Sequence, residues 1–427
     1  MNNHRIIPYE ILYETLKNTS TILDMAFSEQ MEILRSFVRY VLKTLELQVK
    51  KAEEGFPVIG HHFAFPGELF RAYDCVTVVL EACTYLLAAL STTGSEPYYE
   101  IADSYGHPYH ACTSQKGIIG MSIEKLFEFD ILATPTAPCD NTMASYPVIQ
   151  QYQYAKMIIG DMPSYHSERG YKYFGKELRI MNDEVSKTLN QDPDYETLIK
   201  NIEFNNQALQ YLSEINELKK NIPSPFTSIL CPATTGSYPI LLPEDKANFF
   251  KEVLEIGKKR YKNGEEILGG EKIRAIFPYM SVFFDIALCE WMDQLGMNVL
   301  FDLFSYLYFD PIDTSKGIDH IFTELARQAM EYPMTRQSQG FADKMIEDSV
   351  FLAKEYSAQC AVFTSHLGCK QGVSLIQLVR EALRDEAGIP MLTIDIDVGD
   401  KRFTSAQTIK KELINFIHTL DLDKVKV

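Results

Sequence analysis

The chain has 427 residues and a formal net charge of -17. This length suits two or three domains rather than one core, and 46% hydrophobic with 23% charged residues is ordinary for a globular enzyme. The acidic balance argues against nucleic-acid binding, because phosphate contacts need clustered Lys and Arg. The polar start, Met1 to Arg5, is not followed by an apolar signal region, and the best apolar run, Thr77 to Leu90, is interrupted by Glu81. We therefore expect a cytoplasmic protein without membrane contact.

The first half of the chain predicts helices followed by an α/β domain. Residues 1–55 carry apolar residues at helical spacing and form the expected N-terminal helical segment. Residues 56–167 alternate apolar runs with helical patterns, which predicts a parallel sheet with crossover helices. The expected strands of this first domain are Pro57–Gly60, Val76–Leu80, Ile131–Thr134 and Ala155–Ile159.

The second half repeats this organisation after a bridge. Residues 168–270 are mostly helical and charged, with an irregular Pro-rich interval from Pro223 to Pro243, and form a helical bridging region. Residues 271–427 alternate again and predict a second α/β domain, which closes with a helix over Ala406–Leu420. Its expected strands are Ile273–Phe277, Val299–Phe301, Cys360–Thr364 and Met391–Ile394.

The stretch His366-Leu367-Gly368-Cys369-Lys370 stands between a buried strand and a helix. Open parallel sheets place ligands at this end of their strands. Glycine permits close approach of the backbone, and the following helix N-terminus favours negative charge, so a thiolate, a cluster or a phosphate suits the turn. Taken alone, Cys369 is better interpreted as a small buried hydrophobe in a tight turn, and the rest of the chain changes this interpretation.

Three of the eight cysteines share one expected context. Cys112, Cys139 and Cys369 each lie at or just after an expected strand end, beside Gly, Pro, Thr or Asn. Three thiolates that converge from two domains can hold an iron–sulfur cluster with one iron left open. Zinc is less favoured because no C-x-x-C or spaced His pair is present. The remaining cysteines have packing contexts: Cys75, Cys83, Cys231, Cys289 and Cys360.

Other polar residues have two interpretations each. Glu68 follows Pro66 at an expected helix start, where it either favours the dipole or points into the cleft and holds a water on the open iron. His366 either donates to a cluster sulfur or substrate carbonyl, or bonds the backbone. Of His61 and His62, at most one faces the site, because neighbours on a strand alternate. The acidic run from Asp395 to Asp400 favours a salt-bridged turn over a metal site.

Five segments of the chain match one known family: Phe65-Pro66-Gly67-Glu68-Leu69-Phe70-Arg71-Ala72, Ala111-Cys112-Thr113, Pro138-Cys139-Asp140, His366-Leu367-Gly368-Cys369-Lys370, and Ile389 to Asp397 with Asp400 and Arg402. With these segments, the chain resembles the subunits of 2-hydroxyacyl-CoA dehydratases and benzoyl-CoA reductases from about residue 57 onward. The resemblance implies two flavodoxin-like domains with a [4Fe-4S] cluster between them, so that Cys112, Cys139 and Cys369 are the ligands and Glu68 lies near the open iron.

The same resemblance implies an activity and partners. A separate ATP-hydrolysing iron–sulfur activator donates one electron, and an acyl-CoA thioester is reduced to a ketyl radical that loses water. This chain pairs with a related second subunit as a heterodimer. Two alternatives remain: a subunit of an ATP-dependent benzoyl-CoA-type ring reductase, or a non-catalytic electron-transfer protein of the same fold. The latter predicts a fourth protein ligand and no acyl-CoA pocket. A nucleotide-binding Rossmann-like enzyme is disfavoured because no G-x-G-x-x-G follows an expected strand.

Overall fold

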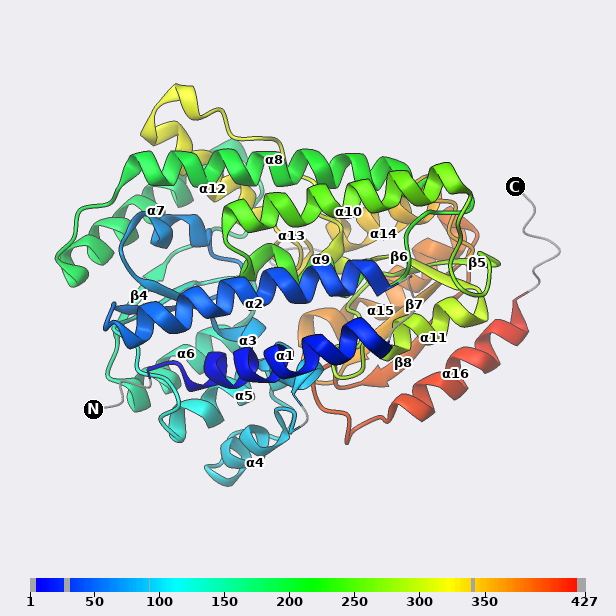
Figure 1. Ribbon diagram of the computed structural model, residues 1–427, viewed down its shortest axis with the longest axis horizontal. Helices are drawn as coiled ribbons and strands as arrows, with labels where there is room; N and C mark the ends of the chain where they lie inside the picture. The colour runs from blue at the N-terminus through cyan, green and yellow to red at the C-terminus, as the bar shows by residue number, and fades with distance from the viewer. Residues whose placement is uncertain (1–4, 27–30, 92, 339–341, 421–427) are drawn as a thin grey trace.

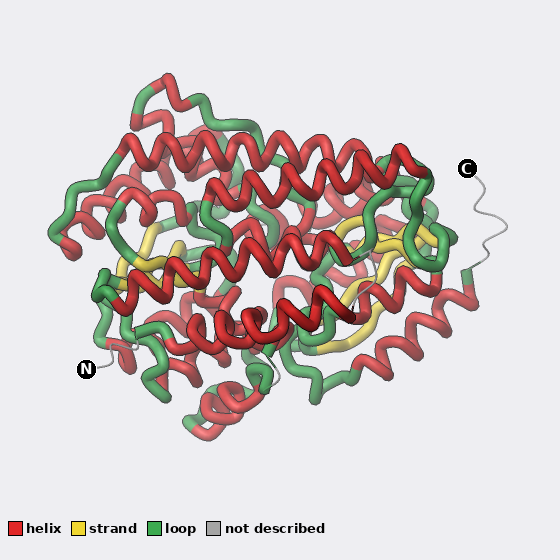
Figure 2. Tube along the Cα trace, viewed as in Figure 1, coloured by secondary structure: helices red, strands yellow, loops and turns green. Residues whose placement is uncertain are grey.

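Two parallel sheets form the framework of the protein. The computed structural model describes residues 5–26, 31–91, 93–338 and 342–420. Each of the two sheets has four strands, and every strand pair is parallel. The sheets lie toward opposite ends of the long axis of the molecule, and long helices extend along that axis beside them (Figure 2). The predicted α/β class with two parallel-sheet domains is confirmed.

The first sheet has the strand order β2-β1-β3-β4. Strands β1 to β3 are buried along their whole length, which explains why they appear in the sequence as continuous apolar runs. The strands are β1 Val58–His61, β2 Val76–Val79, β3 Ile131–Pro135 and β4 Lys156–Gly160. The intervening helices are the 3-10 helix η2 Gly67–Ala72, α3 Leu80–Leu90, α4 Glu96–Ser104, α5 Thr113–Ile123 and α6 Asp140–Gln153.

The second sheet has the order β6-β5-β7-β8, which is the same order of first, second, third and fourth strand as in the first sheet. Both sheets match the beginning of the flavodoxin-like strand order. In that order, ligands bind beside the first strand, at the point where the order of strands across the sheet reverses. The strands are β5 Ile273–Phe277, β6 Met297–Asp302, β7 Cys360–His366 and β8 Met391–Ile396. The helices are α11 Ala287–Leu295, η3 Leu303–Ser305, η4 Thr314–Lys316, α12 Ile318–Met330, α13 Thr335–Ser338, α14 Asp343–Glu355, α15 Lys370–Ala382, a π-helical turn Leu383–Ala387, and α16 Ala406–Thr419.

The remaining helices belong to the N-terminal segment and the bridge. They are α1 Ile7–Ala26, α2 Glu32–Glu53, α7 Glu168–Leu189, α8 Tyr195–Lys219, α9 Leu230–Ile240 and α10 Pro243–Asn263. Helices α2, α8 and α10 lie nearly alongside one another (Figure 1). Helix α2 is amphipathic, and its buried Phe37 packs edge-on against Phe249 of α10 at 6.2 Å. None of the described helices is long and apolar enough to cross a membrane.

Helix α9 corrects one expectation from the sequence. The Pro-rich interval from Pro223 to Pro243 was expected to be irregular, yet its centre is helical. Pro232 lies in the first turn of α9, where backbone N–H groups make no intrahelical hydrogen bond, so its missing N–H costs nothing there. Pro239 is the next-to-last residue of the helix.

The proposed domain limits at 55, 167 and 270 fall between elements of the structure and remain a proposal.

Candidate functional site

The three candidate cysteines line one cavity, which we call the cysteine cavity. Each of them is the N-cap of a helix: Cys112 of α5, Cys139 of α6 and Cys369 of α15. Cys139 and Cys369 follow β3 and β7, which occupy the same place in the two sheets. The expectation that all three follow a strand is wrong for Cys112, because α3 and α4 stand between β2 and this residue.

The two domains approach each other closely at these cysteines. A Cβ atom placed on Gly368 would lie 2.5 Å from Cα and 2.8 Å from N of Cys112, so only glycine fits there. Asn141 Nδ2 donates a hydrogen bond to the Gly368 carbonyl at 3.0 Å. Lys370 Nζ lies 2.8 Å from Asp140 Oδ2. These contacts hold the starts of α5, α6 and α15 together.

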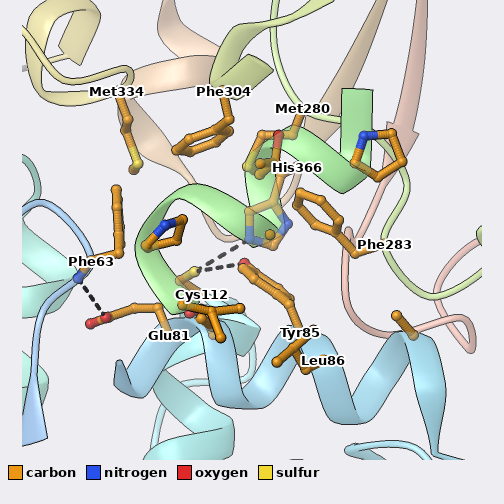
Figure 3. Close-up of a pocket in the computed structure, with 18 of the residues that line it drawn as sticks. Phe63, Glu81, Tyr85, Leu86, Cys112, Met280, Phe283, Phe304, Met334 and His366 are labelled. Atoms are coloured by element: carbon orange, nitrogen blue, oxygen red, sulfur yellow. Dashed lines mark hydrogen bonds between the residues drawn. The ribbon is translucent and has the colours of Figure 1, made fainter. Parts of the chain in front are cut away.

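His366 at the end of β7 faces Cys112. Its Nε2 lies 3.4 Å from Cys112 Sγ, while its Nδ1 lies 3.5 Å from the Val398 N–H and 3.6 Å from Asp397 Oδ2. Accepting from Val398 leaves the proton on Nε2, where it can be donated to sulfur. Burial lowers the pKa of His366, which favours the neutral ring. Tyr85 Oη approaches the same sulfur at 3.8 Å (Figure 3).

Burial keeps the free thiols protonated. It raises the pKa of Cys139 to about 11 and also raises the pKa values of Cys112 and Cys369. A bound cation stabilises the thiolate form of these cysteines, so cation binding releases protons from the thiols. The described residues contain no group of three His, Cys, Asp or Glu side chains that could hold a single metal ion. Three soft sulfur donors around one buried cavity nevertheless suit an iron–sulfur group in kind.

The cysteine cavity is mostly apolar beyond its sulfur atoms. Its volume is about 130 Å³, and it opens to solvent. Side chains from α2, α3, α9 and the loop after β5 form its walls. Figure 3 shows Leu86 of α3 together with Met280 and Phe283 of the loop after β5. Its apolar lining includes Leu34, Phe37, Phe63, Leu86, Leu90, Ile229, Ile240, Met280, Phe283, Ile286, Phe304 and Met334.

Glu81 is a buried carboxylate on this cavity that the sequence interpretation did not select. Its Oε1 accepts hydrogen bonds from Gln115 Nε2 at 3.0 Å and Tyr146 Oη at 3.1 Å, and its Oε2 accepts from the Phe63 N–H at 3.2 Å. Burial raises the pKa of Glu81 to about 7. The sequence did carry an indication, because Glu81 is the acid that interrupts the apolar run from Thr77 to Leu90.

Glu68 lies in a neighbouring cavity rather than among the residues that line the cysteine cavity. The helix expected at Pro66 is the six-residue 3-10 helix η2. Asn205 Nδ2 donates to Glu68 Oε1 in a short hydrogen bond, and Lys246 Nζ lies 3.5 Å from the same oxygen. Phe63 and Tyr332 line both cavities. The proposed role of Glu68 near an open iron therefore remains a prediction, and its carboxylate is engaged in an ion pair.

The two adjacent histidines face different surroundings. His61 lines the cavity of Glu68. His62 Nε2 lies 3.2 Å from Thr142 Oγ1, which in turn lies 3.1 Å from Cys139 Sγ. His62 is therefore linked to Cys139 of the cysteine cavity through the hydroxyl of Thr142.

The acidic run after β8 forms a hydrogen-bonded turn. Asp397 Oδ1 accepts from Thr113 Oγ1 at 2.7 Å, from the Gly399 N–H at 2.9 Å and from the Asp400 N–H at 3.0 Å. Asp400 pairs with Arg402 at 2.7 Å. The turn thus links Thr113, the residue after Cys112, to the second domain, in agreement with the salt-bridged interpretation.

The five other cysteines are buried and do not line the cysteine cavity.

Comparison with known proteins gives one family. Residues 62–420 match the family described as 2-hydroxyglutaryl-CoA dehydratase, D-component. This match includes all three cysteines, His366 and Glu81. No curated protein matches the chain.

Proposed function

Because the chain belongs to the 2-hydroxyglutaryl-CoA dehydratase D-component family, we propose that it is the iron–sulfur, substrate-binding subunit of a radical 2-hydroxyacyl-CoA dehydratase. The observation that carries this proposal is the apolar cavity lined by Cys112, Cys139 and Cys369. An electron-transfer protein needs no such cavity and saturates its cluster with protein ligands. Within the described residues, no fourth cysteine lines the cavity.

In this proposal the three cysteines hold a [4Fe-4S] cluster. When bound, such a cluster supplies a one-electron reductant for a thioester carbonyl and an open iron. His366 donates from Nε2 toward Cys112 Sγ, which stabilises charge on that thiolate. The close contact of Gly368 with Cys112 keeps the cysteine end of the cavity narrow. The apolar walls exclude water from the reacting thioester.

The overall reaction removes the hydroxyl group from C2 and a proton from C3 of the acyl group, and it yields a 2-enoyl thioester and water. We assign the acceptance of that proton to Glu81, because its Oε2 has only the Phe63 N–H as a hydrogen-bond donor among the described residues. Its pKa of about 7 allows it to bind and release a proton near neutral pH.

The proposal includes two protein partners. The family description names a D-component, which implies a complex with at least one other subunit. We infer a related second subunit and a separate ATP-hydrolysing iron–sulfur activator. The sequence supports the latter because it contains no G-x-x-x-x-G-K-[ST] loop to cradle ATP phosphates.

The test is anaerobic purification of the chain alone and with its partner subunit. We expect brown protein with about four irons and four sulfides per chain, and conversion of a 2-hydroxyacyl-CoA to the enoyl-CoA only when partner, activator and ATP are all present. Colourless protein under strict anaerobiosis refutes the cluster. Reduction of an aromatic acyl-CoA with two electrons consumed per product identifies a ring reductase instead.

A further inference from the structure

We propose that the acyl group bound in the cysteine cavity is uncharged and apolar, and that acyl groups ending in a carboxylate, such as glutaryl, are excluded. This inference rests on the proposed function and specifies the substrate class of the same site. It follows from the side chains that form the wall of the cavity.

The described residues that line the cavity include no lysine and no arginine. Apart from the thiols and the tyrosines, the ionisable side chains that line the cavity are Glu81, which is itself an acid, and His366. Both ring nitrogens of His366 face other groups, since Nδ1 lies against Val398 and Nε2 against Cys112. A substrate carboxylate in this cavity would therefore have no cationic side chain with which to pair.

Two cations beside the neighbouring cavity are already engaged in contacts with other groups there. Lys246 is 2% exposed, pairs with Glu68 at 3.5 Å and donates to Asn205 Oδ1 at 2.9 Å. Arg71 donates to the carbonyl oxygens of Leu241 and Ile240. Phe63 and Tyr332 stand on the boundary between the two cavities.

The wall is suited to a hydrocarbon group. Leu86 of α3, Phe283 and Met280 of the loop after β5, and Phe304 and Met334 surround the cavity with aliphatic and aromatic surface (Figure 3). Methionine adapts to irregular apolar shapes, so a branched or aromatic acyl group is accommodated as well as a straight one. Each buried methylene strengthens binding about fourfold, whereas a carboxylate buried without a partner weakens it.

The test uses saturated CoA thioesters, which bind without turnover. The purified complex of this chain and its partner is titrated calorimetrically with hexanoyl-CoA, butyryl-CoA, glutaryl-CoA and free CoA. Hexanoyl-CoA has two more methylenes than butyryl-CoA, so we expect it to bind about 15-fold more tightly. We also expect hexanoyl-CoA to bind at least about tenfold more tightly than glutaryl-CoA, because the glutaryl carboxylate is buried without a cation.

Variants on α3 locate the acyl group. Ala89 lines the cavity, whereas the adjacent Ala88 does not, and both are partly exposed. We expect Ala89→Phe to weaken hexanoyl-CoA binding about tenfold or more by filling the space of two methylenes, while Ala88→Phe leaves it unchanged. Ala82→Leu, at another lining position of the same helix, serves if Ala89→Phe does not fold.

The outcomes separate the two proposals. Glutaryl-CoA binding as tightly as hexanoyl-CoA overturns the inference of an apolar acyl group and leaves the dehydratase proposal intact. Unchanged hexanoyl-CoA binding by a folded Ala89→Phe or Ala82→Leu protein also overturns it, because the acyl group then lies elsewhere. If no thioester binds more tightly than free CoA, the cavity is not an acyl site and both proposals fail.

Discussion

Gly368→Ala tests the close approach of the two domains at the cysteine cavity. The added methyl group would lie 2.5 Å from Cα of Cys112, 2.8 Å from its N and 3.0 Å from C of Ala111. All three are backbone atoms, so no side-chain rotation relieves the overlap. Carbon atoms in good contact are about 3.5 Å apart, and the turn after β7 must therefore move away from the start of α5 by about 1 Å.

The size of the effect follows from that displacement. Forcing a methyl group into a packed interior costs about 1 to 3 kcal/mol. Because the strain falls between two of the proposed ligands, we expect a larger effect on the site than on the fold: reduced iron per chain and a loss of turnover on the order of 100-fold, as a misplacement of about 1 Å can produce.

The assay compares iron content, turnover and the denaturant midpoint on one anaerobic preparation. Leu367→Ala is the matched control, because Leu367 is the neighbouring residue, is 43% exposed and should change stability by no more than about 0.5 kcal/mol. If Gly368→Ala retains wild-type iron, turnover and midpoint, the backbone approach at Cys112 does not exist and the reasoning is refuted.

Four further predictions concern the site and its surroundings. Replacing any one of the three cavity cysteines by alanine should abolish iron retention without preventing folding, whereas Cys289→Ala, in α11, should keep its iron and spectrum; retention in one of the first three removes that residue from the ligand set. Glu81→Gln should keep its iron but lose about 100-fold or more in kcat, and an unchanged kcat would exclude proton transfer there. Glu68→Gln should lower the free energy of unfolding by about 1 to 3 kcal/mol, because Lys246 loses its buried counter-charge; loss of turnover at unchanged stability would instead support a role near the open iron. Burial raises the pKa of Asp293 from 3.8 to about 7, so its favourable contribution is complete below pH 4 and is lost as the pH rises to 7; denaturant titrations should show that Asp293→Asn reduces this decline, and equal pH dependence in both proteins would contradict the shift.

The sheets were predictable because buried parallel strands leave continuous apolar runs in the sequence. Strand β7 is one such run, and the glycine and cysteine after it indicated a ligand-binding turn. Helix α9 was missed because proline usually breaks helices; Pro232 occupies the first turn, where that cost is small, and Pro239 lies one residue before the helix ends. A boundary also differs: β2 ends at Val79 and α3 begins at Leu80, so Glu81 lies in the first turn of a helix and lines the cysteine cavity.

Contacts between distant residues could not be obtained from local patterns. His366 and Cys112 are 254 positions apart, and only the packing of one domain on the other brings them within 3.4 Å. The resemblance suggested that these two residues share a site. It did not indicate that α2 and α9 supply much of the cavity wall, because the walls depend on how the bridge and the N-terminal helices pack on both domains.

The shared strand order gives the protein an internal pseudo-symmetry, and the cysteines break it. Helix α6 after β3 corresponds to α15 after β7, and both begin at a cysteine. The helix that precedes β3 is α5, which begins at Cys112, and its counterpart before β7 is α14, which begins at Ala342. The start of α14 is not among the described residues that line the cysteine cavity, so the first domain contributes two cysteines there and the second contributes one.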